Sequence, residues 1–248
     1  MRQRSVAVAL ALGLMFVGAC GDDDDAEESS DTTAADEGEG DGEGEGAAGG
    51  EFCPAFVELL AGDPEPDQIR EVGTIAPEEI QEPFETIATG FEADPEGYFE
   101  SEEFSTNFAQ IGEVANEECA DDTFDVTAVE YEFQGVPEEV STGVIGVNFT
   151  NDGEEFHEFL VFRRNDDVDQ SFEEILALPE EEATTLVSEV GSAFAPPGST
   201  FPTIFEVTEP GDYAAVCFVP VGSTIDLPEG GDGPPHFTQG MLAEFTVA

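Results

Sequence analysis

The 248-residue sequence lacks lysine and tryptophan, and its five basic residues, all arginine, stand against 59 acidic residues. Its formal net charge at pH 7 is −54. A nucleic-acid-binding surface needs clustered cations that displace phosphate counterions, so this composition excludes that class of function. It also excludes a polybasic patch for anionic lipid. Beyond the N-terminal segment, no apolar run approaches the ~20 residues that a membrane-spanning helix needs.

The first twenty residues have the features of an export signal. Two arginines precede an apolar stretch at 5–16, which is followed by the small residues of 17–19 and by Cys20. Residues 17–20 resemble a bacterial lipobox, in which the cysteine becomes the lipidated first residue of the mature protein. The alternative is an ordinary secretory signal. Both place the protein outside the cytoplasm, where disulfides form, and the lipobox predicts a cell-envelope protein anchored to the membrane through Cys20.

Residues 21–50 contain 13 acidic residues, no basic residue and almost no large apolar side chain. Such a segment buries too little surface to offset its ordering entropy, so we expect an extended, self-repelling tether. A calcium-binding tail is the alternative, although the segment lacks the ligand spacing and the glycine of an EF-hand loop.

Residues 51–121 show apolar side chains at helical spacing, interrupted by Asp-Pro pairs. Cys53 stands near the start of the first expected helix and Cys119 near the end of the last. We interpret the segment as a small helical domain whose ends are tied by a Cys53–Cys119 disulfide. It contains no histidine and shows no catalytic constellation.

The pattern changes at residue 122, where short β-rich runs alternate with Gly, Pro, Asn and Asp. Six or seven such runs over residues 122–248 predict an antiparallel Greek-key β-sandwich. An acidic stretch at 171–190 is expected to form a helical insertion. The predicted fold class of the whole chain is therefore α+β.

Four scarce residues of the chain, two histidines, one cysteine and one methionine, lie at the ends of expected strands in this second segment. Asn151-Asp152-Gly153 forms an expected turn before His157, and a Pro-Gly-Asp-Tyr sequence at 210–213 leads into a strand that ends at Cys217. His236 is followed, after three residues, by Gly240-Met241. These are both histidines of the chain and its last methionine.

This arrangement resembles the cupredoxins, the small blue-copper β-sandwich proteins, over residues 122–248. The resemblance implies one type 1-like copper, with His157, Cys217 and His236 as equatorial ligands and Met241 as the weak axial ligand. A His₂Cys set with a long axial methionine suits neither copper oxidation state fully, so electron transfer needs little rearrangement. The resemblance also implies an electron carrier that is not an enzyme. The acidic charge of this chain implies that a redox protein acting as its partner has a basic docking face.

Several alternatives stay open at this stage. Eighteen residues separate Cys217 from His236, a longer loop than is usual in the family, and this puts copper binding in question. Cys217 could instead be a buried free thiol or pair with another cysteine, and the same ligands also suit zinc. The rival functions are a copper storage or delivery protein and a metal-free interaction module.

The excess of acidic residues in the folded part also suggests adaptation to high ionic strength. Residues 51–248 hold 46 acidic residues and three arginines, and their mutual repulsion destabilises the compact state in dilute buffer. We therefore expect the melting temperature to rise steeply with NaCl concentration. Differential scanning calorimetry over a NaCl series, with sucrose as an uncharged control, measures this. A melting temperature that is flat with salt would contradict the expectation.

Overall fold

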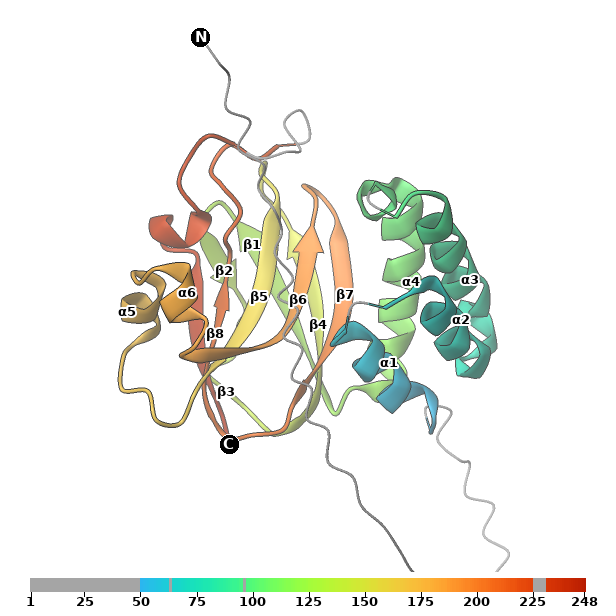
Figure 1. Cartoon of the computed structure of the whole chain (residues 1–248), viewed down its shortest axis with the longest axis horizontal. Helices are drawn as coiled ribbons and strands as arrows, with labels where there is room; N and C mark the ends of the chain where they lie inside the picture. Colours follow the sequence, from blue (N-terminus) through green and yellow to red (C-terminus); the bar gives the residue numbers. More distant parts are fainter. Residues whose placement is uncertain (1–49, 63, 96, 225–230) are drawn as a thin grey trace, which may run out of the picture. The chain divides into compact units, whose positions relative to one another are not determined.

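The computed structural model describes residues 50–248 except 63, 96 and 225–230, and all described residues belong to one compact unit (Figure 1). The predicted signal peptide (1–20), the lipidation site Cys20 and the predicted tether, save for its last residue, lie outside the described residues. Among the helices of the described part, none combines the length and the apolar character needed to cross a bilayer.

Helices occupy the first part of the described chain, as the sequence predicts. Their starts follow local signals: Glu65 and Gln68 form a capping box at the second helix, and the Ser101 hydroxyl accepts a hydrogen bond from the Phe104 amide at the last. The helices are α1 (Phe52–Leu60), α2 (Pro66–Ile75), α3 (Glu78–Ala93), the 3₁₀ turn η1 (Tyr98–Glu100) and α4 (Glu102–Cys119).

A disulfide joins the two ends of this helical segment. Cys53 in α1 and Cys119 at the end of α4 are bonded with an S–S distance of 2.05 Å, which is the pairing that the sequence predicts. The aromatic rings of Phe52, Phe56 and Phe84 pack together nearby, with centroids 5.4–6.1 Å apart. The bond therefore closes a segment that already has an apolar centre.

The rest of the chain forms a sandwich of two sheets. The first sheet has the order β2-β1-β4-β7 and the second the order β3-β9-β8-β5-β6. Their bounds are β1 (Asp122–Val129), β2 (Glu132–Gln134), β3 (Glu139–Val140), β4 (Gly143–Asn151), β5 (His157–Arg164), β6 (Val187–Ala195), β7 (Thr200–Val207), β8 (Gly211–Val216) and β9 (Leu242–Val247).

Both sheets are mixed, which corrects the expectation of a purely antiparallel sandwich. The pairs β1–β4 and β3–β9 are parallel, and the other pairs are antiparallel. The cause is the path of the chain: after β2 it contributes β3 to the second sheet and then returns to place β4 beside β1. Periodicity along single strands carries no information about such crossings.

The predicted helical insertion is shorter than expected. Helices α5 (Phe172–Leu176) and α6 (Glu180–Ala183) are present, but the remainder of 171–190 is wrongly predicted, because β6 begins at Val187 and pairs with β5. Phe172 and Leu176 of α5 pack with Val216 on the outer side of the second sheet. The acidic composition favoured a helix locally, and pairing with β5 overrides it.

Strand β7 connects the helical segment with the sandwich. Residues 201–205 are all buried, because one face of the strand meets the sandwich interior and the other meets α4. Phe108 of α4 stacks on Phe201 with centroids 4.4 Å apart. A Cβ at Gly112 would lie only 2.1 Å from the carbonyl oxygen of Pro202, so glycine permits this close approach. Helices and sandwich therefore share one hydrophobic core.

The disulfide is expected to contribute substantially to stability. It links residues 66 positions apart, and in the chain-entropy model its loss lowers the free energy of unfolding by ~4 kcal/mol. Denaturant unfolding of the Cys53→Ser/Cys119→Ser double variant at fixed NaCl concentration measures this. The reduced wild-type protein should match the double variant, whereas coincident curves for the variant and the oxidised wild type would contradict the expectation.

Candidate metal centre

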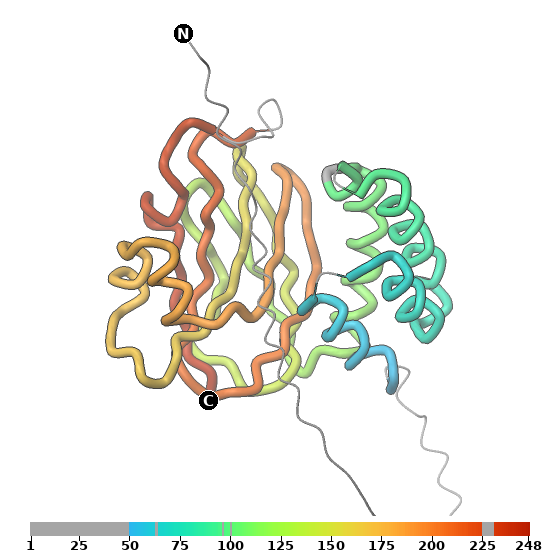
Figure 2. Tube along the Cα trace, viewed as in Figure 1, coloured from blue at the N-terminus to red at the C-terminus, as the bar shows by residue number. Residues whose placement is uncertain are grey.

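The start of β5 and the connection between β8 and β9 lie at the same end of the sandwich (Figure 2). His157 is the first residue of β5, and Cys217 directly follows β8. His236 opens the short 3₁₀ helix η2 (His236–Gln239), and Met241 directly precedes β9. Two separate chain segments, one before β5 and one between β8 and β9, therefore supply these residues.

The turn before His157 is built as the sequence predicts. The side-chain oxygen of Asn151 accepts a hydrogen bond from the amide of Gly153 at 2.8 Å. The Asn151 side-chain nitrogen donates to the carbonyl oxygens of Glu155 and Ala195, both at 2.8 Å. Asn151 is completely buried, so it fixes the segment that delivers His157.

The long loop between Cys217 and His236 is closed near its base. The amide of Phe237 donates to the carbonyl of Cys217 and the amide of His236 to that of Val219, each at 2.9 Å. Pro220 and Pro235 then form an antiparallel bridge. The additional residues of the loop lie beyond this bridge, so loop length does not separate Cys217 from His236.

The potential ligand atoms of three residues converge. Nδ1 of His157 lies 3.1 Å from Nδ1 of His236, and Sγ of Cys217 lies 3.4 Å from the same His236 nitrogen. One ligand atom from each residue falls within 4.8 Å of the others, and all three side chains are 0% exposed. Cys217 is a free thiol, whereas the sequence had left open its pairing with another cysteine.

Met241 adjoins this group through its main chain. Its amide donates to the carbonyl of His236 at 3.2 Å, and its carbonyl accepts from the amide of Cys217 at 3.3 Å. Its side chain is also 0% exposed. The main chain of Met241 therefore lies beside the segments that carry the thiol and one imidazole, and its side chain is buried.

Burial shifts the protonation of the group toward neutral forms. Burial, with a smaller effect from a charge on His236, lowers the pKa of His157 to about 4. Burial also raises the pKa of the Cys217 thiol to about 12. Without a metal, the thiol keeps its proton and His157 is uncharged at neutral pH. A metal ion that binds the sulfur must displace that proton.

The donor set fits a soft or borderline transition metal. Two imidazole nitrogens and a thiol suit copper or zinc, whereas calcium and magnesium prefer oxygen ligands. The two Nδ1 atoms face each other at 3.1 Å, and both side chains are buried. Two neutral imidazoles can share only one hydrogen bond through these atoms, whereas a metal ion would take the lone pairs of both.

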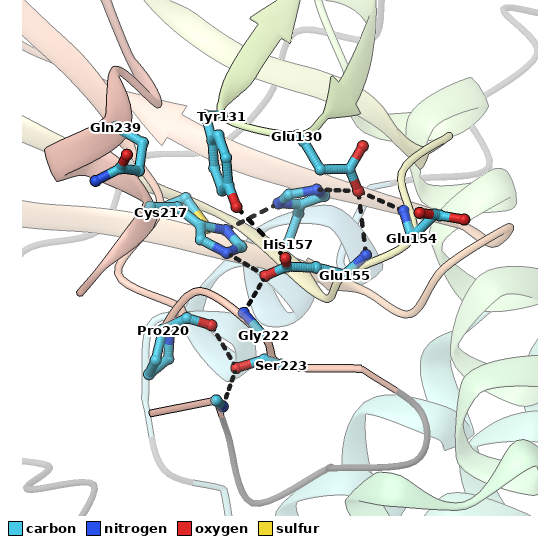
Figure 3. A network of polar contacts seen from close by, with 12 residues as sticks. Glu130, Tyr131, Glu154, Glu155, His157, Cys217, Pro220, Gly222, Ser223 and Gln239 are labelled. Atoms are coloured by element: carbon cyan, nitrogen blue, oxygen red, sulfur yellow. Dashed lines mark hydrogen bonds and ion pairs between the residues drawn. The ribbon is translucent and has the colours of Figure 1, made fainter. Parts of the chain in front are cut away.

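Three carboxylates and a tyrosine adjoin the group, and sequence reasoning missed all four; Glu130, Tyr131 and Glu155 are labelled in Figure 3. Glu155 lies at His236, Glu130 lies near His157, and the carboxylate of Glu158 accepts a hydrogen bond at 2.6 Å from the amide of Phe218. The amide of Glu158 points at Sγ of Cys217 at 3.4 Å. Acidic residues are so abundant in this chain that none of these stood out, although Glu155 and Glu158 flank His157 closely.

Comparison with known proteins gives structural neighbours alone, since the chain matches no family model and no curated protein. A reduced auracyanin from the photosynthetic bacterium Roseiflexus castenholzii aligns over 52% of this chain and 98% of its own, with 19% identity and a TM-score of 0.34. Auracyanin A, a "blue" copper protein from Chloroflexus aurantiacus, aligns over 51% and 98%, with 15% identity and a TM-score of 0.32. A multicopper oxidase covers 53% and 46%, with 11% identity and a TM-score of 0.31.

The lowered pKa of His157 predicts acid sensitivity of the metal-free protein. The imidazole of the unfolded chain has a pKa of about 6.5, so His157 of the unfolded state is protonated below that pH. In the folded state its pKa is about 4, so it stays neutral until the pH falls that far. This difference in pKa leaves the free energy of unfolding unaffected above about pH 6.5 and lowers it by up to ~3 kcal/mol as the pH approaches 4. We expect His157→Gln to lose less stability than the wild type between neutral pH and about pH 5. Denaturant unfolding of both metal-free proteins measures this, and parallel losses would contradict it.

Proposed function

We propose that the sandwich is a cupredoxin-type domain that binds one copper ion through His157, Cys217, His236 and Met241 and carries single electrons. The observation that supports this most directly is the convergence of three fully buried ligand atoms within 4.8 Å. When bound, copper supplies one-electron chemistry by alternating between two oxidation states. The protein's own part is to hold the four side chains in place.

The surroundings of the site favour a carrier over a storage or delivery protein. The ligand side chains are 0% exposed, and main-chain hydrogen bonds link Cys217, His236 and Met241 directly to one another. A protein that hands over its metal has to present ligands to a partner, whereas a carrier has to keep the ion and change little during electron exchange. The described residues therefore support electron transfer as the function, with delivery as the alternative.

The site also accommodates zinc, which takes the same nitrogen and sulfur ligands. Zinc has no redox chemistry, so a zinc-bound protein would be a structural module and not a carrier. The proposed thioether ligand of Met241 favours copper, because thioethers are soft ligands that select Cu(I). Metal analysis of the purified, folded protein separates these cases.

The location and partner of the protein follow from the sequence and stay part of this proposal. The lipobox-like residues before Cys20 support a lipid-anchored protein at the extracytoplasmic face of a membrane. The strongly acidic folded part supports a redox partner with a basic docking face, whose association should weaken as salt is added.

The first test of this proposal is the spectrum of the metal-free protein after addition of Cu(II). We expect an intense visible absorption band from a copper–thiolate bond at one equivalent of metal, because Cys217 is the sole free thiol among the described residues. Cys217→Ser should abolish the band and most of the bound copper. Met241→Leu, which keeps the thiolate and both imidazoles, should keep the band and shift the reduction potential.

The outcomes separate the rival functions. A band that persists in Cys217→Ser, with unchanged copper content, would show that the ligand assignment is wrong. Absence of any bound metal in the folded wild type would leave a metal-free interaction module. Circular dichroism confirms that each variant is folded, and rapid loss of Cu(I) to a chelator would favour delivery over electron transfer.

A further inference from the structure

The outer nitrogens of the two imidazoles have different surroundings. Nε2 of His236 lies 3.0 Å from a carboxylate oxygen of Glu155, within hydrogen-bonding distance. Nε2 of His157 lies 4.0 Å from a carboxylate oxygen of Glu130 and has no hydrogen-bond partner among the described residues. The two histidines are therefore not equivalent, although their Nδ1 atoms face the same point (Figure 3).

Other groups hold the Glu155 carboxylate in place. The oxygen that contacts His236 also accepts a hydrogen bond from the amide of Gly222 at 2.5 Å. The other oxygen lies 3.4 Å from the hydroxyl of Tyr131. The Glu155 side chain is only 15% exposed, so its contact with His236 is largely shielded from water. Glu155 thus connects the segment before β5 with the long loop and with the β1–β2 turn.

The β1–β2 turn is shaped for this contact. Tyr131 has a φ of 65°, and it is the one described non-glycine residue with a positive φ. This left-handed conformation costs free energy for a bulky residue and is typical of functional sites. It places the Tyr131 ring against the His236 ring, with centroids 5.0 Å apart and planes at 67°. The turn therefore covers the outer edge of His236, which is 0% exposed.

A neutral imidazole carries its proton on one nitrogen and a lone pair on the other. The carboxylate of Glu155 is a hydrogen-bond acceptor, so it favours the His236 tautomer with the proton on Nε2. That tautomer leaves the lone pair on Nδ1, the nitrogen that faces Cys217 and His157. Carboxylates in this outer position orient metal-bound histidines and raise their basicity.

We infer that Glu155 is a positioning residue that fixes the tautomer and ring orientation of His236, and that Tyr131 and Gly222 hold Glu155 in this role. This inference rests on the proposed metal site for its effect on affinity. The tautomer itself is a property of the metal-free protein as well. His157 has no such partner, so the protein fixes one imidazole before the metal arrives and leaves the other less constrained.

Nuclear magnetic resonance of ¹⁵N-histidine-labelled protein tests the tautomer, because the chain contains only two histidines. In metal-free wild type at mildly alkaline pH, we expect His236 to show a protonated Nε2 and a slowly exchanging Nε2–H. In Glu155→Ala this proton should exchange rapidly and the tautomers should mix. Glu155→Gln, which keeps an acceptor oxygen, should retain much of the wild-type pattern.

Metal affinity tests the consequence for the site. We expect Glu155→Ala to bind Cu(II) about 10- to 100-fold more weakly than the wild type, which is the usual effect of removing an outer partner of a ligating histidine. Tyr131→Phe keeps the ring but loses the hydroxyl, so its loss of affinity should be smaller. Glu154→Ala is the matched control, because this neighbouring acid is exposed and should leave affinity and tautomer unchanged.

The two proposals fail in different ways. If the wild type binds copper through a thiolate, but Glu155→Ala keeps its affinity and the protected Nε2–H, the role of Glu155 is wrong and the metal site stands. If the wild type binds no metal yet shows the Glu155-dependent tautomer, the proposed function is wrong and the positioning of His236 stands. Equal losses in Glu154→Ala and Glu155→Ala would indicate a general charge effect and overturn the inference.

Discussion

Complete burial of one thiol and two imidazoles is the constraint around which this end of the sandwich is built. Polar groups removed from water need partners, and charged ones need them most. The protein meets the first need with a neutral thiol and a neutral His157, whose pKa values burial has moved in opposite directions. It supplies hydrogen bonds around the rim, and at the centre Nδ1 of His236 lies within hydrogen-bonding distance of both Nδ1 of His157 and Sγ of Cys217.

The exterior of the folded part contrasts with this neutral interior. Its three arginines each contact at least one carboxylate: Arg70 contacts Asp67, Glu85 and Glu92, while Arg164 contacts Asp212. Arg163 contacts Asp166 and Glu209. The remaining acids have no arginine partner among the described residues, so the folded part keeps a large excess of negative charge. An excess of this sign attracts cationic partners.

Much of this arrangement could be predicted because it depends on scarce residues. Cys53 and Cys119 stood at the two ends of a helical segment, and two histidines, a cysteine and a methionine stood at strand ends. The carboxylate of Glu155 could not be singled out among 59 acids, because only folding brings it to His236. Strand β6 was missed for a related reason: its pairing with β5 is a long-range contact, and its sequence alone favours no sheet. Parallel pairing within both sheets likewise depends on how the chain crosses between them.

The bridge between Pro220 and Pro235 makes the intervening stretch of chain a natural insertion point. Main-chain hydrogen bonds on the strand side of the bridge fix the spacing of Cys217 and His236. Insertions or deletions between Pro220 and Pro235 should therefore change the positions of these two residues little. The entropic cost of closing a loop rises slowly with its length, by ~0.6 kcal/mol for each doubling. Evolution could therefore diversify this tip, or an engineer could graft a recognition peptide onto it, provided that the contact from Gly222 to Glu155 is preserved.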